Sequence, residues 1–190
     1  MSSKVEIANR ALQILGAKRI VSLTEDSRNA RAIAAAYEPV KRAEIRKHPW
    51  SFAIKRVQLA ADATAPIFTR SNSFPLPSDY LRILSPDPEV NMNDLDWIIE
   101  GRNIITNDSA PLDVRYLWDV QDPNLFDSTF REVLAAKLAE QLCEELTQSN
   151  TKVATAQAFY KDALAEAKRT NAIEKVAEKP PEDEWVTIRN

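Results

Sequence analysis

The spacing of apolar residues changes twice along the chain, and this change constrains the fold more than any other feature of the sequence. Apolar residues recur at helical spacing up to Pro49 and again beyond about residue 121. Between these stretches the apolar runs are short and β-prone, and prolines stand at positions 66, 75, 77, 86, 88 and 111. We therefore predict an α+β fold, a bundle of about four helices with a small antiparallel β-rich lobe inserted in it.

The same changes divide the 190 residues into four parts. We expect the first half of the helical frame over 1–50, the inserted β-rich lobe over 51–120, a helical hairpin that completes the frame over 121–170, and an extended C-terminal tail over 171–190.

Capping residues mark the first two helices. Ser3 and Glu6 have the spacing of a capping box, and Gly16 stands where the first helix should end. A second helix follows "TEDS" and stops before Pro49, because the residue before a proline disfavours helical backbone. Pro39 falls inside this second pattern, so we expect a kink or a short break there.

Short β-prone runs fill the lobe, and helical spacing returns after it. The runs are "IFT", "YLRIL", "DWIIE", "RNIIT" and "LDVRYLW". The third and fourth predict a hairpin around Gly101. Helical patterns over about 127–148 and 151–170, separated by "TQSN", predict an antiparallel helical hairpin.

The sequence offers little of the chemistry that common enzyme sites use. His48 is the only histidine and Cys143 the only cysteine, which excludes a zinc site of the usual Cys/His kind. Gly16 and Gly101 are the only glycines, so no glycine-rich phosphate loop can form. Cys143 lies among leucines in a helical pattern, and we expect a buried, unreactive thiol. We therefore predict no catalytic, metal-binding or cofactor-binding residue, and no cofactor.

No segment of the sequence is apolar enough to suggest a membrane protein. The apolar runs stay far shorter than the roughly 18 residues that a membrane span needs. The N-terminal run "MSSKVEIANRALQILG" also lacks the long apolar stretch of a signal peptide. We expect a protein made in the cytoplasm, with no membrane partner.

The segment "RKHPWSFAIKR" holds the only histidine and four basic residues. Catalysis by His48 would need a nucleophile and an orienting acid nearby; Ser51 is close in sequence, but no Gly-x-Ser-x-Gly elbow surrounds it. We interpret His48, Pro49, Trp50 and Phe52 as a structural corner. In this reading the proline ends the helix, and the aromatic rings fill the junction between helices and sheet.

Basic residues gather just before and after this corner. Positions 41–56 hold six lysines and arginines against one acid, Glu44, although the whole chain has a net charge of −3. Arg42 and Arg46 lie one helical turn apart, and Lys47 follows them. We predict that Arg42, Arg46 and Lys47 contact a protein partner. A face that is solvated or paired within the chain, and salt-sensitive contacts to DNA phosphates, are the alternatives.

We predict that the last residues form an extended tail that binds a partner. "EKVAEKPPEDEWVTIRN" is charged, and its two prolines oppose a helix. Trp185, Val186 and Ile188 are the apolar residues that would anchor it to a partner.

Grouped carboxylates keep one enzyme class open. The groups are Asp94 with Asp96, Glu144-Glu145 and Glu182-Asp183-Glu184. A glycoside hydrolase needs two carboxylates at a fixed separation across the sugar, and sequence does not give that separation.

Several motifs in order along the chain resemble one known family. They are "KVEIANRALQILGAKRIVSLTEDSRNARA", "YEPVKRAEIRKHPWSFA", "FPLPSDYLRIL" and "IEGRNIITNDSAPLDVRYL", which together cover roughly residues 4–116. This combination resembles the tail tubular protein A family of short-tailed bacteriophages, the head-to-tail adaptor or gatekeeper proteins. The helical hairpin after these motifs also fits the family, whereas the tail after Thr170 matches no family motif.

The resemblance implies a structural virion protein rather than an enzyme. Members of the family fold as a helical bundle with a β-rich lobe and assemble as a twelve-fold ring. The ring lies between the portal protein and the tail nozzle (a tail tubular protein B-like partner), extends the channel for double-stranded DNA and helps retain packaged DNA. It also offers a docking surface to tail fibres or spikes. The implied location is the virion tail, with assembly in the host cytoplasm.

Two other function classes stay open at this point. One is a tail-associated polysaccharide or cell-wall hydrolase that uses a carboxylate pair. The other is a DNA-binding module that uses the basic run.

The tail gives the first testable prediction. Removing the residues after Thr170 should abolish portal binding, because the apolar anchors lie in the tail. It should leave the monomer folded, because the predicted helical frame ends before the tail begins. Portal binding and far-ultraviolet circular dichroism measure the two effects, and a truncated protein that binds the portal normally would contradict the assignment.

Overall fold

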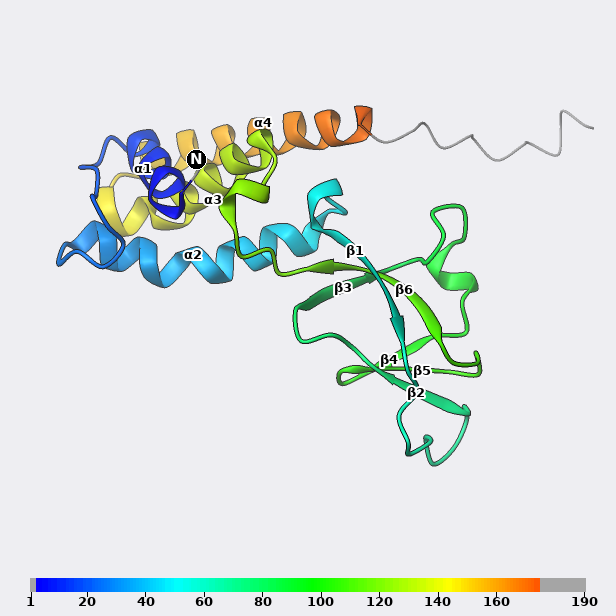
Figure 1. Cartoon of the computed structure of the whole chain (residues 1–190). Coiled ribbons are helices and arrows are strands. Elements are labelled where there is room, and N and C mark those ends of the chain that lie inside the picture. The colour runs from blue at the N-terminus through cyan, green and yellow to red at the C-terminus, as the bar shows by residue number, and fades with distance from the viewer. Residues whose placement is uncertain (1–2, 175–190) are drawn as a thin grey trace, which may run out of the picture.

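The computed structural model describes residues 3–174, which form a helical body with a β lobe extending from one end of it (Figure 1). The predicted α+β architecture is confirmed. The predicted anchors Trp185, Val186 and Ile188 lie outside the described residues. The helices of the body are α1 (Lys4–Ile14), α2 (Arg28–Lys47), α3 (Ser128–Thr147) and α4 (Asn150–Ile173).

Capping residues set the ends of α1 as the sequence predicts. Ser3 Oγ accepts a hydrogen bond from Glu6 N at 3.1 Å, and Ser3 N donates to Glu6 Oε2 at 2.9 Å. Gly16 follows the last turn with φ of +65°, a left-handed backbone that other residues rarely adopt. The capping box and the glycine stop are both confirmed.

Helix α2 runs without interruption from Arg28 to Lys47 and carries Pro39 in its interior. Of the kink or short break that we expected at Pro39, the break is therefore wrong. A proline cannot donate the helical hydrogen bond at its own position, which destabilises the helix. Burial of neighbouring residues offsets this loss, because Tyr37, Val40 and Ile45 all pack in the core.

Two small antiparallel sheets build the lobe within residues 54–118. The first has the strand order β1–β6–β3, and the second has the order β2–β5–β4. Strand β6 is the centre of the first sheet and pairs with β1 from Leu59↔Leu112 to Ile54↔Leu117. The strands are β1 (Ile54–Leu59), β2 (Asn72–Pro75), β3 (Tyr80–Leu84), β4 (Ile98–Glu100), β5 (Asn103–Thr106) and β6 (Leu112–Trp118).

The strand predictions hold for part of the lobe. "YLRIL" and "LDVRYLW" coincide with β3 and β6, and β4 and β5 form the expected hairpin around Gly101, whose φ is +58°. "IFT" is not a strand, and this prediction is wrong. Ile67 and Phe68 are 97% and 76% exposed in the loop between β1 and β2, so no sheet buries them. Strands β1 and β2 were not identified from the sequence.

The body and the lobe each have a hydrophobic core. Ile33 and Leu134 are fully buried in the core of the body, whereas Phe74 and Ile104 are fully buried in the core of the lobe. Leu117, near the end of β6, belongs to the core of the body. Strand β6 therefore runs from one core into the other, which ties the lobe to the helices.

Helices α3 and α4 form the predicted antiparallel hairpin. Asp127 caps the start of α3, and Gln148 ends it in a left-handed conformation with φ of 52°. Helix α4 continues to Ile173, beyond the expected end at about residue 170. Cys143 is fully buried, as expected. Among residues 3–174, no helix is both long and apolar enough to cross a membrane.

The buried aromatic rings should contribute more to stability than the exposed ones. Phe130 is fully buried and packs against Trp50, Phe52 and Phe126, with ring centroids 5.1, 4.9 and 5.4 Å away. We expect Phe130→Ala to lower the free energy of unfolding by about 3–5 kcal/mol. Phe68→Ala, the matched change at an exposed ring, should alter it by less than about 0.5 kcal/mol. Urea denaturation measures both, and equal effects would contradict this packing.

Candidate functional site

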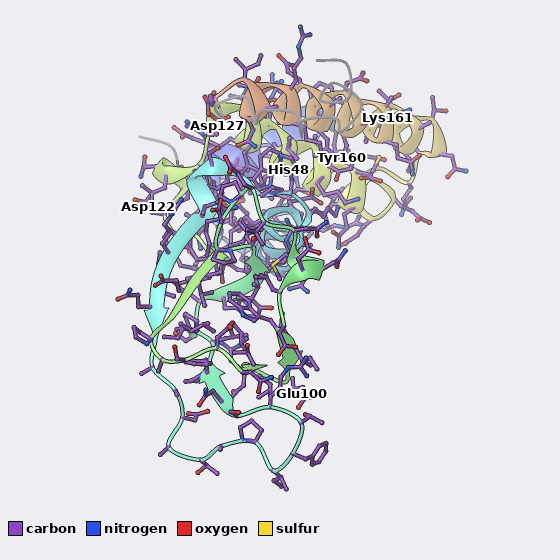
Figure 2. The ribbon with its side chains drawn as sticks, turned by 90° about the vertical axis from the view of Figure 1, so that its right-hand side faces the viewer. His48, Glu100, Asp122, Asp127, Tyr160 and Lys161 are labelled. Carbon is purple, nitrogen blue, oxygen red and sulfur yellow. The ribbon has the colours of Figure 1, made fainter. Side chains whose placement is uncertain are left out.

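The predicted functional residues of the described chain gather where α2 passes into the lobe. In Figure 2, His48 lies in the helical part near this joint, and Glu100 lies toward the far end of the lobe. Helix α2 ends at Lys47, and the next residue, His48, has an extended backbone ahead of Pro49. A single turn of 3-10 helix, η1 (Ser51–Ala53), then leads into β1. The basic run and the corner therefore occupy one region.

Trp50 fills the centre of the corner. Its side chain is 1% exposed, and its indole Nε1 donates to the backbone oxygen of Glu44 at 3.0 Å. The ring of His48 contacts it edge-on with a centroid distance of 4.7 Å. The side chain of Phe52 joins the aromatic cluster with Phe130 at 4.9 Å. These contacts fit a packing role for the corner.

Asn171 completes the corner from the last turn of α4. Its Oδ1 accepts hydrogen bonds from both the N and the Oγ of Ser51 at 2.9 Å. Its Nδ2 forms a 3.1 Å hydrogen bond with His48 Nε2. Asn171 was not predicted from the sequence, because the extended tail was expected to span residues 171–190. The one available signal was the helical spacing, which continues through Ile173.

A buried lysine forms the charged centre of the joint. Lys41 on α2 has no exposure to solvent, and its Nζ lies 2.7 Å from Glu38 Oε2 and 2.9 Å from Asp119 Oδ1. The other oxygen of Asp119 accepts from Arg42 Nε at 2.7 Å. Asp119 directly follows β6, and its backbone N donates to Asp79 O at 2.8 Å. This network connects α2 to the lobe through charge.

A second buried acid connects α2 to α4. Glu44 is 1% exposed, and its carboxylate accepts hydrogen bonds from Lys47 Nζ and from Tyr160 Oη, the latter at 2.9 Å. Burial and the hydrogen bond to Glu44 raise the pKa of Tyr160 above its ordinary value. Lys47, predicted to bind a partner, thus has an acid of its own chain beside it.

Two arginines meet where α2 packs against β3. Arg46 Nη1 donates to Leu81 O, and Arg82 Nη1 donates to Lys47 O at 3.3 Å. Burial and then the positive charge of Arg46 lower the pKa of Arg82. Arg46 was predicted from sequence as a partner contact, but Arg82 was not. Arg82 lies on β3, far from the basic run in the sequence, so nothing in the sequence indicated that it would lie beside Arg46.

A third polar group lies inside the lobe. Asp79 accepts from Lys55 Nζ at 2.8 Å and from Tyr116 Oη at 3.0 Å. Burial raises the pKa of Asp79, but these two hydrogen bonds outweigh it and hold the pKa below the ordinary value. Burial and the bond to Asp79 raise the pKa of Tyr116 to about 12. Lys55 also lies 3.6 Å from the ring centroid of Trp118.

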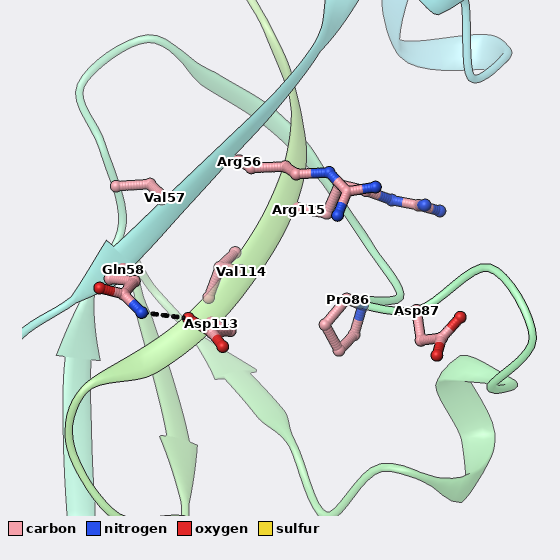
Figure 3. Close-up of a pocket in the computed structure, with 8 residues that line it drawn as sticks. All are labelled: Arg56, Val57, Gln58, Pro86, Asp87, Asp113, Val114 and Arg115. Carbon is pink, nitrogen blue, oxygen red and sulfur yellow. Dashed lines mark hydrogen bonds between the residues drawn. The ribbon is translucent and has the colours of Figure 1, made fainter.

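A hollow of about 520 Å³ lies along β1, β6 and the loop after β3 (Figure 3). Arg56 and Arg115 stand directly opposite each other in the β1–β6 ladder, and their side chains run side by side in Figure 3. Gln58 Nε2 donates to Asp113 Oδ1 at 2.9 Å beside them, and Asp87 lies across the hollow. Arginine forks bind carboxylates and phosphates, so this hollow suits an anionic group better than an apolar one.

The carboxylate groups named from sequence lie apart from this joint. Asp94 is exposed in the short helix η2 (Met92–Asp94), while Asp96 is held by Arg70 and Asn107. Glu144 and Glu145 are exposed near the end of α3. The third group, over 182–184, lies outside the described residues. Among residues 3–174, no three His, Cys, Asp or Glu side chains are placed to hold a metal ion.

Comparison with known proteins adds no relative. No protein-family model matches the chain. No curated protein matches it either.

The length of α4 corrects one detail of the truncation experiment. Removing everything after Thr170 would delete Asn171 and its bonds to Ser51 and His48. We therefore expect that shorter chain to fold less stably than the full chain. A truncation after Glu174, at the end of α4, removes the tail and keeps the corner intact.

The buried charge of Lys41 makes Asp119 the first residue to test. Asp119→Ala leaves Lys41 buried with Glu38 as its only carboxylate partner, and we expect the free energy of unfolding to fall by about 3 kcal/mol. Asp26→Ala is the matched control, because it removes an ion pair with Arg31 in which the side chains are 94% and 67% exposed. The control should cost less than about 1 kcal/mol. Equal losses in urea denaturation would contradict the network.

The lowered pKa of Asp79 predicts a dependence of stability on acid. Its folded pKa lies below the unfolded value of 3.8, so its ionised form stabilises the fold above pH 3.8, and this stabilisation is lost as the pH falls through the folded pKa. Asp79→Asn should therefore be less stable than the wild type near pH 7. The difference should shrink as the pH falls below about 3. Denaturation curves across this range measure it, and a gap that stays constant would rule out the mechanism.

Proposed function

We propose that this chain is a head-to-tail adaptor of a short-tailed bacteriophage, a structural virion protein that forms a ring between the portal and the tail nozzle. The ring extends the DNA channel and retains packaged DNA. One observation carries the proposal: the motifs that resemble the tail tubular protein A family fall on successive elements of a helical frame with an inserted lobe. "KVEIANRALQI" forms α1, "HPWSFA" forms the corner, "IEGRNIIT" spans the β4–β5 hairpin, and "LDVRYL" forms β6.

The shape of the molecule supports an adaptor role. The helical body and the β lobe extend in different directions from the joint (Figure 1), so the two can contact different partners at the same time. A ring also needs two different faces on each copy, because a head-to-tail contact repeats until it closes. The joint described above fixes these two parts relative to each other through a buried ion cluster and a continuous strand.

The distribution of apolar residues supports an assignment of partners. In the β1–β2 loop of the lobe, Ile67 is almost fully exposed and Phe68 is three-quarters exposed. Exposed apolar and aromatic side chains of this kind are typical contact points between proteins. We assign the lobe to the tail nozzle, and the helical body with the C-terminal tail to the portal. In this arrangement the helices face the capsid.

Electron microscopy of the purified protein mixed with the portal protein of the same genome tests the proposal. A ring stacked on the portal, with the lobes pointing away from it, is the expected result. Absence of binding to the portal at micromolar concentrations would contradict the proposal. Sugar release from cell-wall polysaccharide and salt-dependent DNA binding would then be measured next.

Substitution of the tail anchors separates the two contacts. Trp185→Ala with Ile188→Ala should weaken portal binding at least about tenfold, since aromatic anchors dominate interface energies. Ile67→Ala with Phe68→Ala is the matched control, because it also removes one isoleucine and one aromatic side chain, here from the lobe. It should leave portal binding unchanged and weaken nozzle binding. The affinity of each variant for the purified portal and nozzle proteins measures the two effects. Loss of nozzle binding by the tail variant and of portal binding by the loop variant would contradict the assignment of the two ends.

A further inference from the structure

Two arginines at the joint leave positive charge without a matching acid. Arg46 on α2 and Arg82 on β3 are held close together by crossed hydrogen bonds, each to a backbone oxygen next to the other arginine. Within residues 3–174, neither guanidinium forms an ion pair with a carboxylate. Like charges held at close range destabilise the monomer unless something between them carries the opposite charge. We call these two residues the arginine pair.

The other charged residues around the arginine pair form ion pairs with one another. Arg42, one turn before Arg46, pairs with Asp119, which also serves Lys41. Lys47 pairs with Glu44, which faces α4. The acids near the joint are therefore engaged with other cations, and the arginine pair keeps its excess of positive charge.

Helix α4 carries the opposite imbalance. Asp162 and Glu166 are exposed and lie four residues apart, a spacing at which like charges repel on a helix. We call them the acidic pair. Within residues 3–174 neither forms an ion pair, including with Arg169, which follows Glu166 by three positions.

The acidic pair lines a groove of about 650 Å³ beside α3. Arg10 is the basic residue of this groove, and its Nε lies 2.9 Å from Glu132 Oε2. Its guanidinium also stands 5.8 Å from the ring centroid of Phe159. The charge of Arg10 is thus matched by Glu132, and the acidic pair keeps two negative charges at a groove that also has an aromatic wall.

The two pairs lie on different sides of the molecule. Tyr160 on α4 points toward α2, because its hydroxyl donates to Glu44. At about 100° per residue, Asp162 and Glu166 lie about 200° and 240° around the helix from Tyr160 and face away from α2. By the same geometry Arg46 lies about 200° around α2 from Glu44 and faces away from α4. The pairs therefore cannot neutralise each other within one molecule.

We propose that the arginine pair of one copy binds the acidic pair of the next copy. The contact is head-to-tail, uses two different faces of the chain, and cancels a repulsion on each side of it. Two guanidinium groups can bind two carboxylates through paired hydrogen bonds, and the ring of Phe159 offers an apolar surface to an arginine stem. The inference deepens the proposed function, since it rests on the ring and assigns residues to the contact between its subunits.

Two charge-reversed variants of the full chain test the contact. The first, Arg46→Glu with Arg82→Glu, has negative charge on both faces. The second, Asp162→Lys with Glu166→Lys, has positive charge on both faces. Sedimentation velocity of the protein alone, up to about 1 mM, compares self-association at about 20 mM and about 500 mM salt. We expect the wild type to associate at low salt, and each variant to lose association at least about tenfold.

Mixing the two variants is the decisive arm. In a head-to-tail contact between the two variants, the reversed arginine face of the first meets the reversed acidic face of the second with opposite charge, and their two unchanged faces are complementary as well. The mixture should therefore associate as the wild type does, although neither component associates by itself. The variant that carries all four substitutions should also regain association. These recoveries keep the test valid if one substitution perturbs folding, which circular dichroism monitors.

Matched controls change the same amount of charge elsewhere on exposed surface. They are Lys18→Glu with Arg19→Glu, and Glu144→Lys with Glu145→Lys. Both should associate like the wild type. Controls that lose association equally, a mixture that fails to recover it, or a wild type that stays monomeric up to about 1 mM at low salt would each overturn the inference.

The outcome is separate from that of the adaptor proposal. Recovery in the mixture with no binding to the portal would keep this contact and remove the adaptor function. A ring on the portal that forms equally well from either variant alone would keep the function and remove the contact.

Discussion

Lys41 carries its charge at a position with no exposure to solvent, and the arrangement of body and lobe depends on how that charge is matched. Its partners are Glu38, on the same helix, and Asp119, which directly follows β6. A buried ammonium without an acid is strongly unfavourable, so Lys41 can stay buried in this joint only with the carboxylates of Glu38 and Asp119 beside it. The aromatic packing of Trp50 supplies apolar burial beside it. Charge and packing thus act on the same joint, and the orientation of the lobe follows from both.

The sequence predicts the elements whose signals are local. The Ser3–Glu6 capping box, the Gly101 hairpin and the alternation along "LDVRYLW" each depend on neighbours within a few residues, and all three are found in the structure. The elements missed are those that depend on distant partners. Strand β1 alternates only weakly, because the adjacent residues Lys55 and Arg56 are both charged, and it is held by pairing with β6. Pro39 is the converse case, in which tertiary packing maintains a helix that local signals would interrupt.

In the candidate site, too, local features could be predicted from the sequence and contacts between distant residues could not. Arg42, Arg46 and Lys47 stand out because they cluster in sequence, but what surrounds two of them comes from elsewhere in the chain. The ion-pair partner of Arg42, Asp119, is 77 positions away, and Arg46 lies beside Arg82 of β3. Arg82 and Asn171 were missed for this reason, since their significance lies in contacts with α2 and the corner. Sequence alone also cannot tell a basic face paired within the chain from one left unpaired. The structure separates the two, with Arg42 and Lys47 matched by acids and Arg46 left beside Arg82.

The hydrogen bonds of Asn171 have a mechanical consequence. They attach the final turn of α4 to Ser51 and His48, so the C-terminal end of the helix is fastened to the joint as well as to α3. Tension applied beyond Glu174 is then carried first by the corner between body and lobe, not by the helix tip alone. A pull on the end of the chain therefore acts on the same joint that fixes the lobe relative to the helices.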